Sequence, residues 1–365
     1  MKAKLCLILA VVMLLSGCSW NGLGEYLSVA PHREDTNRIN HENVVASNYP
    51  QLLQAMTALV EACSESGLIY VPDYGSKLES DIEKVIRQVS TNHPIGAYAL
   101  EQVLYEVGTG SGQQAVAIEL KYLHDISEIR RIKQCKTMDN AKEEIAYALY
   151  SCTDKLVIQI EDYHHVDFVQ FVQDYAYENP SEVMELPDVS VGIYPENGEQ
   201  RVVELKFTYQ TSRDALRSMQ GQVRPIFDAA VLYVSGDGQD IEKLNQLYAF
   251  LMERFDYQYD TSITPVYSLL RHGVGDSMAF AMVYAAMCRN AGLDCHIVSG
   301  TRDAEAWHWN IVRIGDRHYH VDLLESAELG SLQTLNDDQM AGYVWDYFAY
   351  PACEETEETV PEITE

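Results

Sequence analysis

The hydrophobic pattern of the chain contains one long stretch without a polar face. From Met278 to Cys288 every residue is apolar or tyrosine, and a helix that is hydrophobic all round is buried on every side. Asp276 is a good N-cap for this stretch, and Gly292 suits the left-handed position that stops a helix. The pattern therefore predicts a central buried helix between Gly275 and Gly292.

Strand-like runs follow this helix, and a second helix precedes it. The predicted strands are Cys295–Val298, Trp307–Ile314 and His318–Leu323. The helix before the central stretch is predicted at Asp240–Phe255 from its apolar spacing. Residues 337–346 are expected to form a further helix at the edge of the domain. This order predicts a central helix packed against an antiparallel sheet.

The pattern between residues 49 and 222 occurs twice. An apolar helix ends at Cys63 in the first copy and at Cys152 in the second, and a strand containing E-L-K-Y or E-L-K-F follows in each. We predict two copies of a helix–strand–helix–strand–helix unit. Chance similarity between two α/β segments is the alternative.

The N-terminus has the pattern of a lipoprotein signal peptide. Lys2 and Lys4 precede an apolar stretch, Leu5–Leu15, that is too short to span a bilayer. The L-S-G-C sequence ending at Cys18 resembles a bacterial lipobox. We expect cleavage after residue 17, acylation of Cys18 and an extracytoplasmic protein anchored to the cell membrane by lipid. An ordinary secretory signal is the alternative.

Charge and cysteine content exclude some classes of function. The net charge of −29 argues against nucleic acid as a partner. Of eight cysteines, Cys6 lies in the signal peptide and Cys18 is the acylation site, so six remain. An even number permits disulfides outside the cell but does not require them. No C-x-x-C pair, phosphate loop or calcium loop occurs, and we expect no cofactor.

Residues 241–324 contain a set of residues, in and after the central stretch, whose order and spacing are specific. In order, they are Gly275, Phe280, Ala281, Gly292, Leu293, Trp309, Asn310 and Asp322. This set resembles the transglutaminase-like superfamily, which has a papain-like fold and a Cys-His-Asp triad. In that family the nucleophilic cysteine opens the central helix, and the histidine and aspartate lie on the following strands. The resemblance implies the same central helix and sheet.

Two positions of the implied triad depart from the family. Ser277 stands at the position of the cysteine, and Trp307 stands at the position of the histidine. His308 is one residue further along, on the other face of the strand unless a bulge redirects it. Only Asp322 keeps its family identity, so the degenerate triad positions are Ser277, His308 and Asp322.

Ser277 has two interpretations. It is either a helix-start hydroxyl that satisfies a backbone donor or a nucleophile, and a serine nucleophile needs an adjacent base. An indole N–H can donate a hydrogen bond but cannot accept a proton. We therefore predict that Ser277 has no imidazole partner and that Trp307, a tyrosine or backbone donors hold Asp322.

The last predicted strand carries a candidate set of metal ligands. His318, His320 and Asp322 alternate along it and so share one face, and an H-x-H-x-D set suits some transition metals. Polar residues lining a vacated cleft are the commoner arrangement, and we expect no metal site here.

The sequence predicts an α/β (α+β) chain with six parts: a signal peptide (1–17), a tether (18–45), two α/β repeats (46–135 and 136–235), a transglutaminase-like domain (236–350) and a disordered acidic tail (351–365). The predicted function is non-catalytic binding of a peptide, cell-wall fragment or partner protein. The alternative is an acyl-transfer enzyme, a protease, amidase or transglutaminase, with Ser277 as nucleophile and His308, His296 or His320 as base. A purely structural surface protein is the third class.

Overall fold

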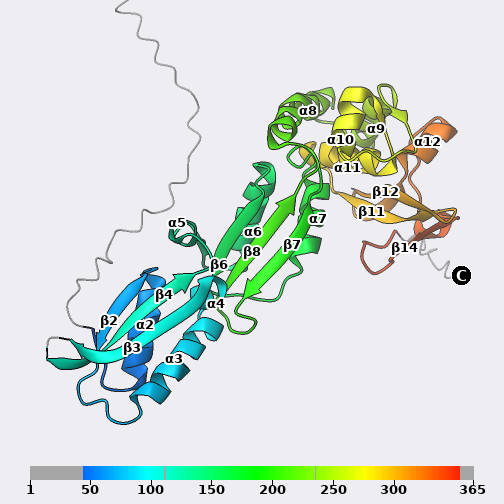
Figure 1. The fold of residues 1–365 in the computed structure, drawn as a ribbon. Helices are drawn as coiled ribbons and strands as arrows, with labels where there is room; N and C mark the ends of the chain where they lie inside the picture. The colour runs from blue at the N-terminus through cyan, green and yellow to red at the C-terminus, as the bar shows by residue number, and fades with distance from the viewer. Residues whose placement is uncertain (1–43, 111, 235, 354–365) are drawn as a thin grey trace, which may run out of the picture. The chain divides into compact units, whose positions relative to one another are not determined.

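The computed structural model describes residues 44–110, 112–234 and 236–353 (Figure 1). The predicted signal peptide, Cys18, nearly all of the tether and most of the acidic tail lie outside the described residues. None of the helices within the described ranges combines the length and the apolar character that crossing a bilayer requires. The fold is a mixed α/β fold, as predicted.

The first part of the described chain forms a four-stranded sheet with the strand order β1-β2-β4-β3. Its strands are β1 (Val44–Val45), β2 (Ser66–Tyr70), β3 (Leu100–Gly110) and β4 (Gln113–Tyr122), and its helices are α2 (Tyr49–Glu61), α3 (Leu78–Asn92) and α4 (Pro94–Ala99). Alternate residues of β4, Val116, Ile118 and Leu120, are buried. This alternation is expected of a strand with one face against a core.

A second four-stranded sheet follows, with the order β5-β6-β8-β7. Its strands are β5 (Lys133–Cys135), β6 (Lys155–Ile160), β7 (Asp188–Tyr194) and β8 (Arg201–Thr208), and its helices are α6 (Met138–Tyr150) and α7 (Phe168–Glu178), after the short α5 (Ile126–Ile129). Ile158 and Val203 of the sheet share a core with Ile145 of α6 and Val172 of α7.

These two blocks have the same order of strands, but they differ in detail from the predicted repeats. Each sheet contains two strands more than the two predicted, β1 and β3 in the first block and β5 and β7 in the second. Lys133–Cys135 pairs with β6 and so lies in the second sheet, whereas the predicted boundary placed it in the first block. Cys63 and Cys152 both follow their helix at a φ of 50°. Duplication of the unit stays a prediction.

The third part contains a sheet with the order β13-β12-β11-β14. Its strands are β11 (Cys295–Arg302), β12 (Glu305–Ile314), β13 (Arg317–Val321) and β14 (Tyr343–Trp345). The helical elements are α8 (Arg213–Tyr233), α9 (Asp240–Met252), α10 (Pro265–Tyr267), the π-helix η1 (Ser268–His272), α11 (Ser277–Asn290), α12 (Leu323–Leu329) and the 3-10 helix η2 (Asp337–Gln339). The short strands β9 (Asp256–Tyr257) and β10 (Val274–Gly275) pair in parallel.

Helix α11 is the predicted central helix. Asp276 caps it by accepting a hydrogen bond from the backbone N–H of Ala279 at 2.9 Å, and every residue from Ala279 to Cys288 is buried. It packs against β11 and β12, and the hydroxyl of Tyr284 donates to the carbonyl of Leu244 in α9 at 3.1 Å. The prediction of a buried helix against an antiparallel sheet is confirmed.

Two predictions near this helix differ from the structure. Residues 337–346 do not form one helix, because Gly342 adopts a φ of 86° and Tyr343–Trp345 pairs with β11. The helix predicted to end the second repeat is longer than expected. Val223 and Phe227 in its second half share a hydrophobic core with residues of α9 and α11. The apolar positions of this second half therefore pack with the central helix.

Candidate functional site

Ser277 is the first residue of α11 and lies against strand β12. Its side chain is buried, and its Oγ accepts a hydrogen bond from the backbone N–H of His308 at 3.3 Å. The hydroxyl thus satisfies a backbone donor, although the donor comes from the strand and not from the helix. Among the described residues, no imidazole nitrogen is hydrogen bonded to this hydroxyl.

Asp322 lies at the end of β13, where four donors converge on its carboxylate. Oδ2 accepts from the indole Nε1 of Trp307 at 2.6 Å and from the hydroxyl of Tyr343 at 2.8 Å. Oδ1 accepts from the backbone N–H groups of Leu324 at 2.9 Å and Glu325 at 3.2 Å, so Asp322 is the N-cap of α12. The prediction that Trp307, a tyrosine or backbone donors hold Asp322 is confirmed, and all three kinds of donor are present.

Arg302 adds positive charge beside this carboxylate. Its Nη1 lies 3.9 Å from Asp322 Oδ2, and its guanidinium carbon lies 5.4 Å from the ring centre of Trp307 and 5.7 Å from that of Tyr343. Burial, followed by the charge of Asp322, raises the pKa of Tyr343 well above its ordinary value. Tyr343 therefore stays protonated and acts as a donor.

His308 presents its backbone, and not its ring, to Ser277. Burial lowers the pKa of the imidazole, and the charge of Asp276 raises it by less. The ring is therefore mainly neutral at neutral pH. The Asp276 carboxylate already accepts the backbone N–H of Ala279, so it serves as the helix cap.

His320 is fully buried, in contact with the rings of Trp309 and Trp345. Its Nδ1 accepts from the indole Nε1 of Trp309 at 2.9 Å, and its Nε2 lies 2.8 Å from Asp337 Oδ1. Since Nδ1 is an acceptor, the neutral ring carries its hydrogen on Nε2 and donates it to Asp337. Both nitrogens are engaged, and neither partner is Ser277.

The structure does not bring the predicted set of His318, His320 and Asp322 together around one point. Among the described residues, the ligand atoms of His318 group with those of Asp294 and His296, and those of His320 group with Asp337 and Cys353. The carboxylate of Asp322 is occupied by its own donors. Each of the three side chains has partners from other elements instead.

Sequence reasoning missed two residues of the site, Arg302 and Tyr343. Arg302 ends β11 beside a turn, and an arginine next to an aromatic-rich strand is a weak signal of cation–π stacking. Tyr343 lies in the segment that was predicted as helix, 21 residues from Asp322 along the chain. No local pattern predicts a contact over that separation.

One side of the site carries exposed aromatic surface. The rings of Tyr257 and Trp307 lie 5.7 Å apart between centroids, and the Arg302 guanidinium lies over the Trp307 ring. Tyr257 is 42% exposed. We call these three residues, Tyr257, Arg302 and Trp307, the aromatic surface. The arrangement offers rings and a cation for contact, and none of the described side chains accepts a hydrogen bond from the Ser277 hydroxyl.

Comparison with solved structures gives low similarity. A transglutaminase crystal structure has a TM-score of 0.26 at 8% identity, over 53% of this chain and 58% of that chain. A proposed protease from Parabacteroides distasonis has a TM-score of 0.24 at 11% identity, over 70% of this chain and 39% of that one. A proposed cysteine protease from Cytophaga hutchinsonii has a TM-score of 0.26 at 12% identity, over 53% and 73%.

Comparison with sequences is more specific. No curated protein matches the chain. The chain spans 58% of the length of the transglutaminase of known structure, which is less than two thirds. The family model of the transglutaminase-like superfamily matches residues 228–323. This range contains the central helix, strands β11 to β13, and the positions of Ser277, Trp307 and Asp322. Residues 228–323 of this chain therefore form a transglutaminase-like domain.

Proposed function

We propose that the transglutaminase-like domain is non-catalytic and binds a peptide, cell-wall fragment or partner protein at its vestigial active site. One observation carries the proposal: the Nε1–H of Trp307 donates to Asp322 at 2.6 Å. In a Cys-His-Asp triad, the residue between the nucleophile and the aspartate must accept a proton. The indole N–H has no lone pair for this task.

The surroundings of Ser277 support the same proposal. A serine hydroxyl becomes nucleophilic only with a base that takes its proton. The Oγ of Ser277 is in contact with the backbone N–H of His308, which is a donor. The alternative acyl-transfer enzyme would need the neutral ring of His308 to turn toward this hydroxyl.

The aromatic surface suggests how binding would occur. Trp, Tyr and Arg are the residues that most often contribute large binding energies in interfaces. Rings pack on apolar faces of peptides and sugars, and the guanidinium can bind carbonyl or carboxylate oxygens. Tyr257, Trp307 and Arg302 supply these groups beside the site where the family performs its chemistry.

The location of the domain belongs to the same proposal. The lipobox at Cys18 is expected to hold the protein at the outer side of the cell membrane, where peptides and cell-wall fragments are available. The acidic composition supports a partner other than nucleic acid.

Catalysis is tested by labelling the purified protein with a fluorophosphonate and by following amide and ester hydrolysis. We expect no labelling at Ser277 and no turnover above that of the Ser277→Ala variant. Labelling that disappears in both Ser277→Ala and His308→Ala would support the acyl-transfer enzyme instead.

Binding is tested with soluble peptidoglycan fragments and with a peptide library, using calorimetry. Tyr257→Ala is expected to weaken binding by at least about fivefold, the loss that defines an important interface residue. Tyr147→Ala is the matched control, because Tyr147 is an exposed tyrosine on α6. Equal affinities in the two variants would contradict a role for the aromatic surface.

A further inference from the structure

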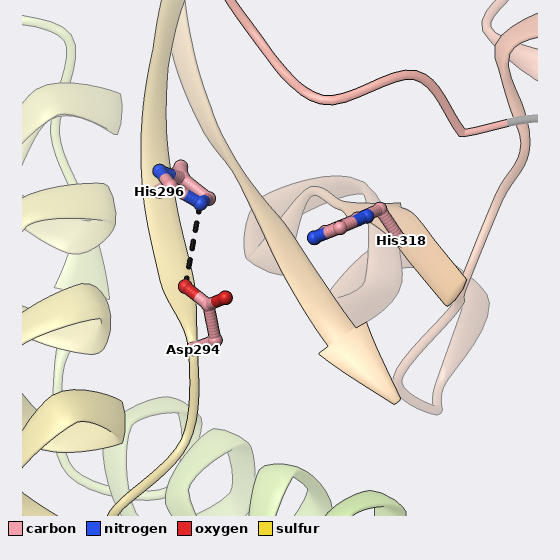
Figure 2. A group of neighbouring side chains, drawn as sticks. All are labelled: Asp294, His296 and His318. Carbon is pink, nitrogen blue, oxygen red and sulfur yellow. Dashed lines mark ion pairs between the residues drawn. The ribbon is translucent and has the colours of Figure 1, made fainter. Parts of the chain in front are cut away.

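Three potential metal ligands meet on strands β11 and β13, away from the Ser277 site. Asp294 immediately precedes β11 and His296 lies within it, so the two share a strand face. His318 lies in β13, which is separated from β11 by β12. Figure 2 shows the ring of His318 directed toward the pair of Asp294 and His296. One ligand atom from each residue lies within 4.8 Å of the other two.

The three side chains are close, and two of them are accessible. His296 Nε2 lies 3.3 Å from Asp294 Oδ1, and their side chains are 43% and 42% exposed. The rings of His296 and His318 are 6.5 Å apart between centroids. Exposed side chains change rotamer readily, so small rotations can bring the three ligand atoms to a common centre.

We propose that Asp294, His296 and His318 bind a late first-row divalent cation such as Zn²⁺, Ni²⁺ or Cu²⁺. Imidazole nitrogens suit these metals, and two histidines with one carboxylate leave further positions for water. Calcium and magnesium prefer ligand sets made of oxygen. The ligand set therefore selects the class of cation.

Arg313 orients the carboxylate and also competes with the metal. Its Nε lies 3.5 Å from Asp294 Oδ2, on the oxygen that His296 does not contact. Its backbone N–H donates to the carbonyl of Asp294 at 3.0 Å, which fixes Asp294 in register beside β12. A bound cation would take Asp294 Oδ1 and leave Oδ2 to the guanidinium, in the way that outer partners commonly hold metal-bound carboxylates.

A cation bound at this site would stabilise one edge of the sheet. β13 is at one end of the order β13-β12-β11-β14. A cation held by His296 and His318 links β13 to β11 across the intervening strand. Because the cation binds the folded chain and not an unfolded one with scattered ligands, it stabilises the fold.

The other three-ligand group among the described residues is less suited to a metal. In the group of His320, Asp337 and Cys353, the indole of Trp309 donates to His320 Nδ1. The thiol must lose its proton to bind a metal. Burial, followed by the charge of Asp337, raises the pKa of Cys353 to about 12. These contacts explain this group as a buried hydrogen-bonded cluster.

The test uses the purified full chain without a histidine tag, treated with a chelator and titrated with Zn²⁺ and Ni²⁺ in a calorimeter. We expect one site per chain and a rise in melting temperature with metal. His318→Ala and His296→Ala are expected to lower the affinity by at least about tenfold, the smallest loss expected when even an outer partner is removed.

The matched control is His164→Ala. His164 Nε2 lies 3.3 Å from Asp162 Oδ1, the same separation as in the proposed site, but this pair belongs to no three-ligand group in the described part of the chain. This variant is expected to bind the metal like the unchanged protein. Unchanged affinity in both His296→Ala and His318→Ala would overturn the proposal. A Co²⁺ complex with a thiolate charge-transfer band would also overturn it, because the metal would then bind a cysteine.

Discussion

Asp322 in this chain is an acceptor for structural donors. A catalytic aspartate of a triad holds a histidine ring, whereas Asp322 accepts from an indole, a phenol and two backbone N–H groups. Its side chain is nearly fully buried. Burial makes each of these hydrogen bonds costly to break, because the donors that remain cannot reach water.

Asp322→Ala is therefore predicted to destabilise the fold strongly. Loss of the α12 cap costs about 1 kcal/mol, and the Trp307 N–H left without an acceptor costs about 1–3 kcal/mol. The Tyr343 hydroxyl keeps Glu325 as an acceptor, so chemical denaturation is expected to give a total loss of roughly 2–4 kcal/mol. Asp322→Asn keeps the cap acceptor and is expected to lose less. A stable Asp322→Ala variant would contradict the structural role.

His93 caps helix α4 in a way that depends on protonation. Its Nδ1 accepts the backbone N–H of Gly96 at 3.2 Å, and protonation would convert this acceptor into a donor. Burial lowers the pKa of His93, while the nearby Glu61 raises it by less. The neutral ring is the form that the folded chain prefers.

The sign of the pH dependence follows from this preference. The unfolded chain takes up the proton first, near its ordinary pKa of about 6.5, so the free energy of unfolding falls as the pH drops from there toward the lower folded pKa. His93→Asn keeps an acceptor at the cap and is expected to weaken this dependence. His308 and His320 change in the same direction, so part of it remains. Identical pH profiles for the two proteins would contradict the assignment.

Some of this residue-scale chemistry could be predicted and some could not. The identities of Ser277 and Trp307 are read directly from the sequence, and the indole donor to Asp322 follows from the chemistry of Trp307. The role of Tyr343 could not be predicted, because the contact depends on how a distant segment folds back. The grouping of His318 with Asp294 and His296 likewise depends on the register of β12 between their strands.

At the scale of elements, β11 and β14 come close because position 300 is glycine. A Cβ atom at Gly300 would lie 2.3 Å from the carbonyl oxygen of Val344 and 2.8 Å from the ring of Trp309. Strand β14 carries Tyr343, so the same approach positions the phenol that donates to Asp322.

Gly300→Ala is predicted to destabilise the sheet by about 1–3 kcal/mol, the usual cost of overpacking, with loss of protection of the β14 amides in hydrogen exchange. The carbonyl cannot rotate away as a side chain could. Gly108→Ala in β3 is the control, because a Cβ atom there meets nothing within 4 Å. Equal stability of the two variants would mean that the close approach is not required.

Elements with strong local patterns could be predicted, and elements that depend on partners could not. The central helix was predicted to within a few residues because its burial and caps are local signals. The sequence pattern does not predict strands β1, β3, β5 and β7, and it predicts a helix at residues 337–346 where the structure has none of that length. Strand β14 is only three residues long, so pairing with β11 and not its own sequence gives it its structure.

At the scale of the whole molecule, the chain joins two α/β blocks of the same strand order to a transglutaminase-like domain. The equivalent positions of Cys63 and Cys152, each at a positive φ after its helix, agree with the predicted repeat. The proposed anchor lies outside the described residues and depends on the sequence alone.

Cys18→Ala is predicted to abolish lipid attachment. The acylated residue of a lipobox is its cysteine, which is Cys18 in this chain. Metabolic labelling with a fatty acid is expected to mark the unchanged protein and not the variant. A variant that is still labelled would contradict the lipobox interpretation.

In the proposed function, the site lacks a base because Trp307 occupies the position of the family histidine. The most direct measurement compares the alkylation rates of residue 277 in Ser277→Cys and in Ser277→Cys with Trp307→His, followed by peptide mass spectrometry. The six cysteines of the described residues are buried, so they contribute little background. A histidine between the new thiol and Asp322 lowers the thiol pKa from about 8.5 to about 7.5 or below. We predict markedly faster alkylation of the double variant at neutral pH. Equal rates in the two variants would contradict the interpretation that Trp307 occupies the position of the base.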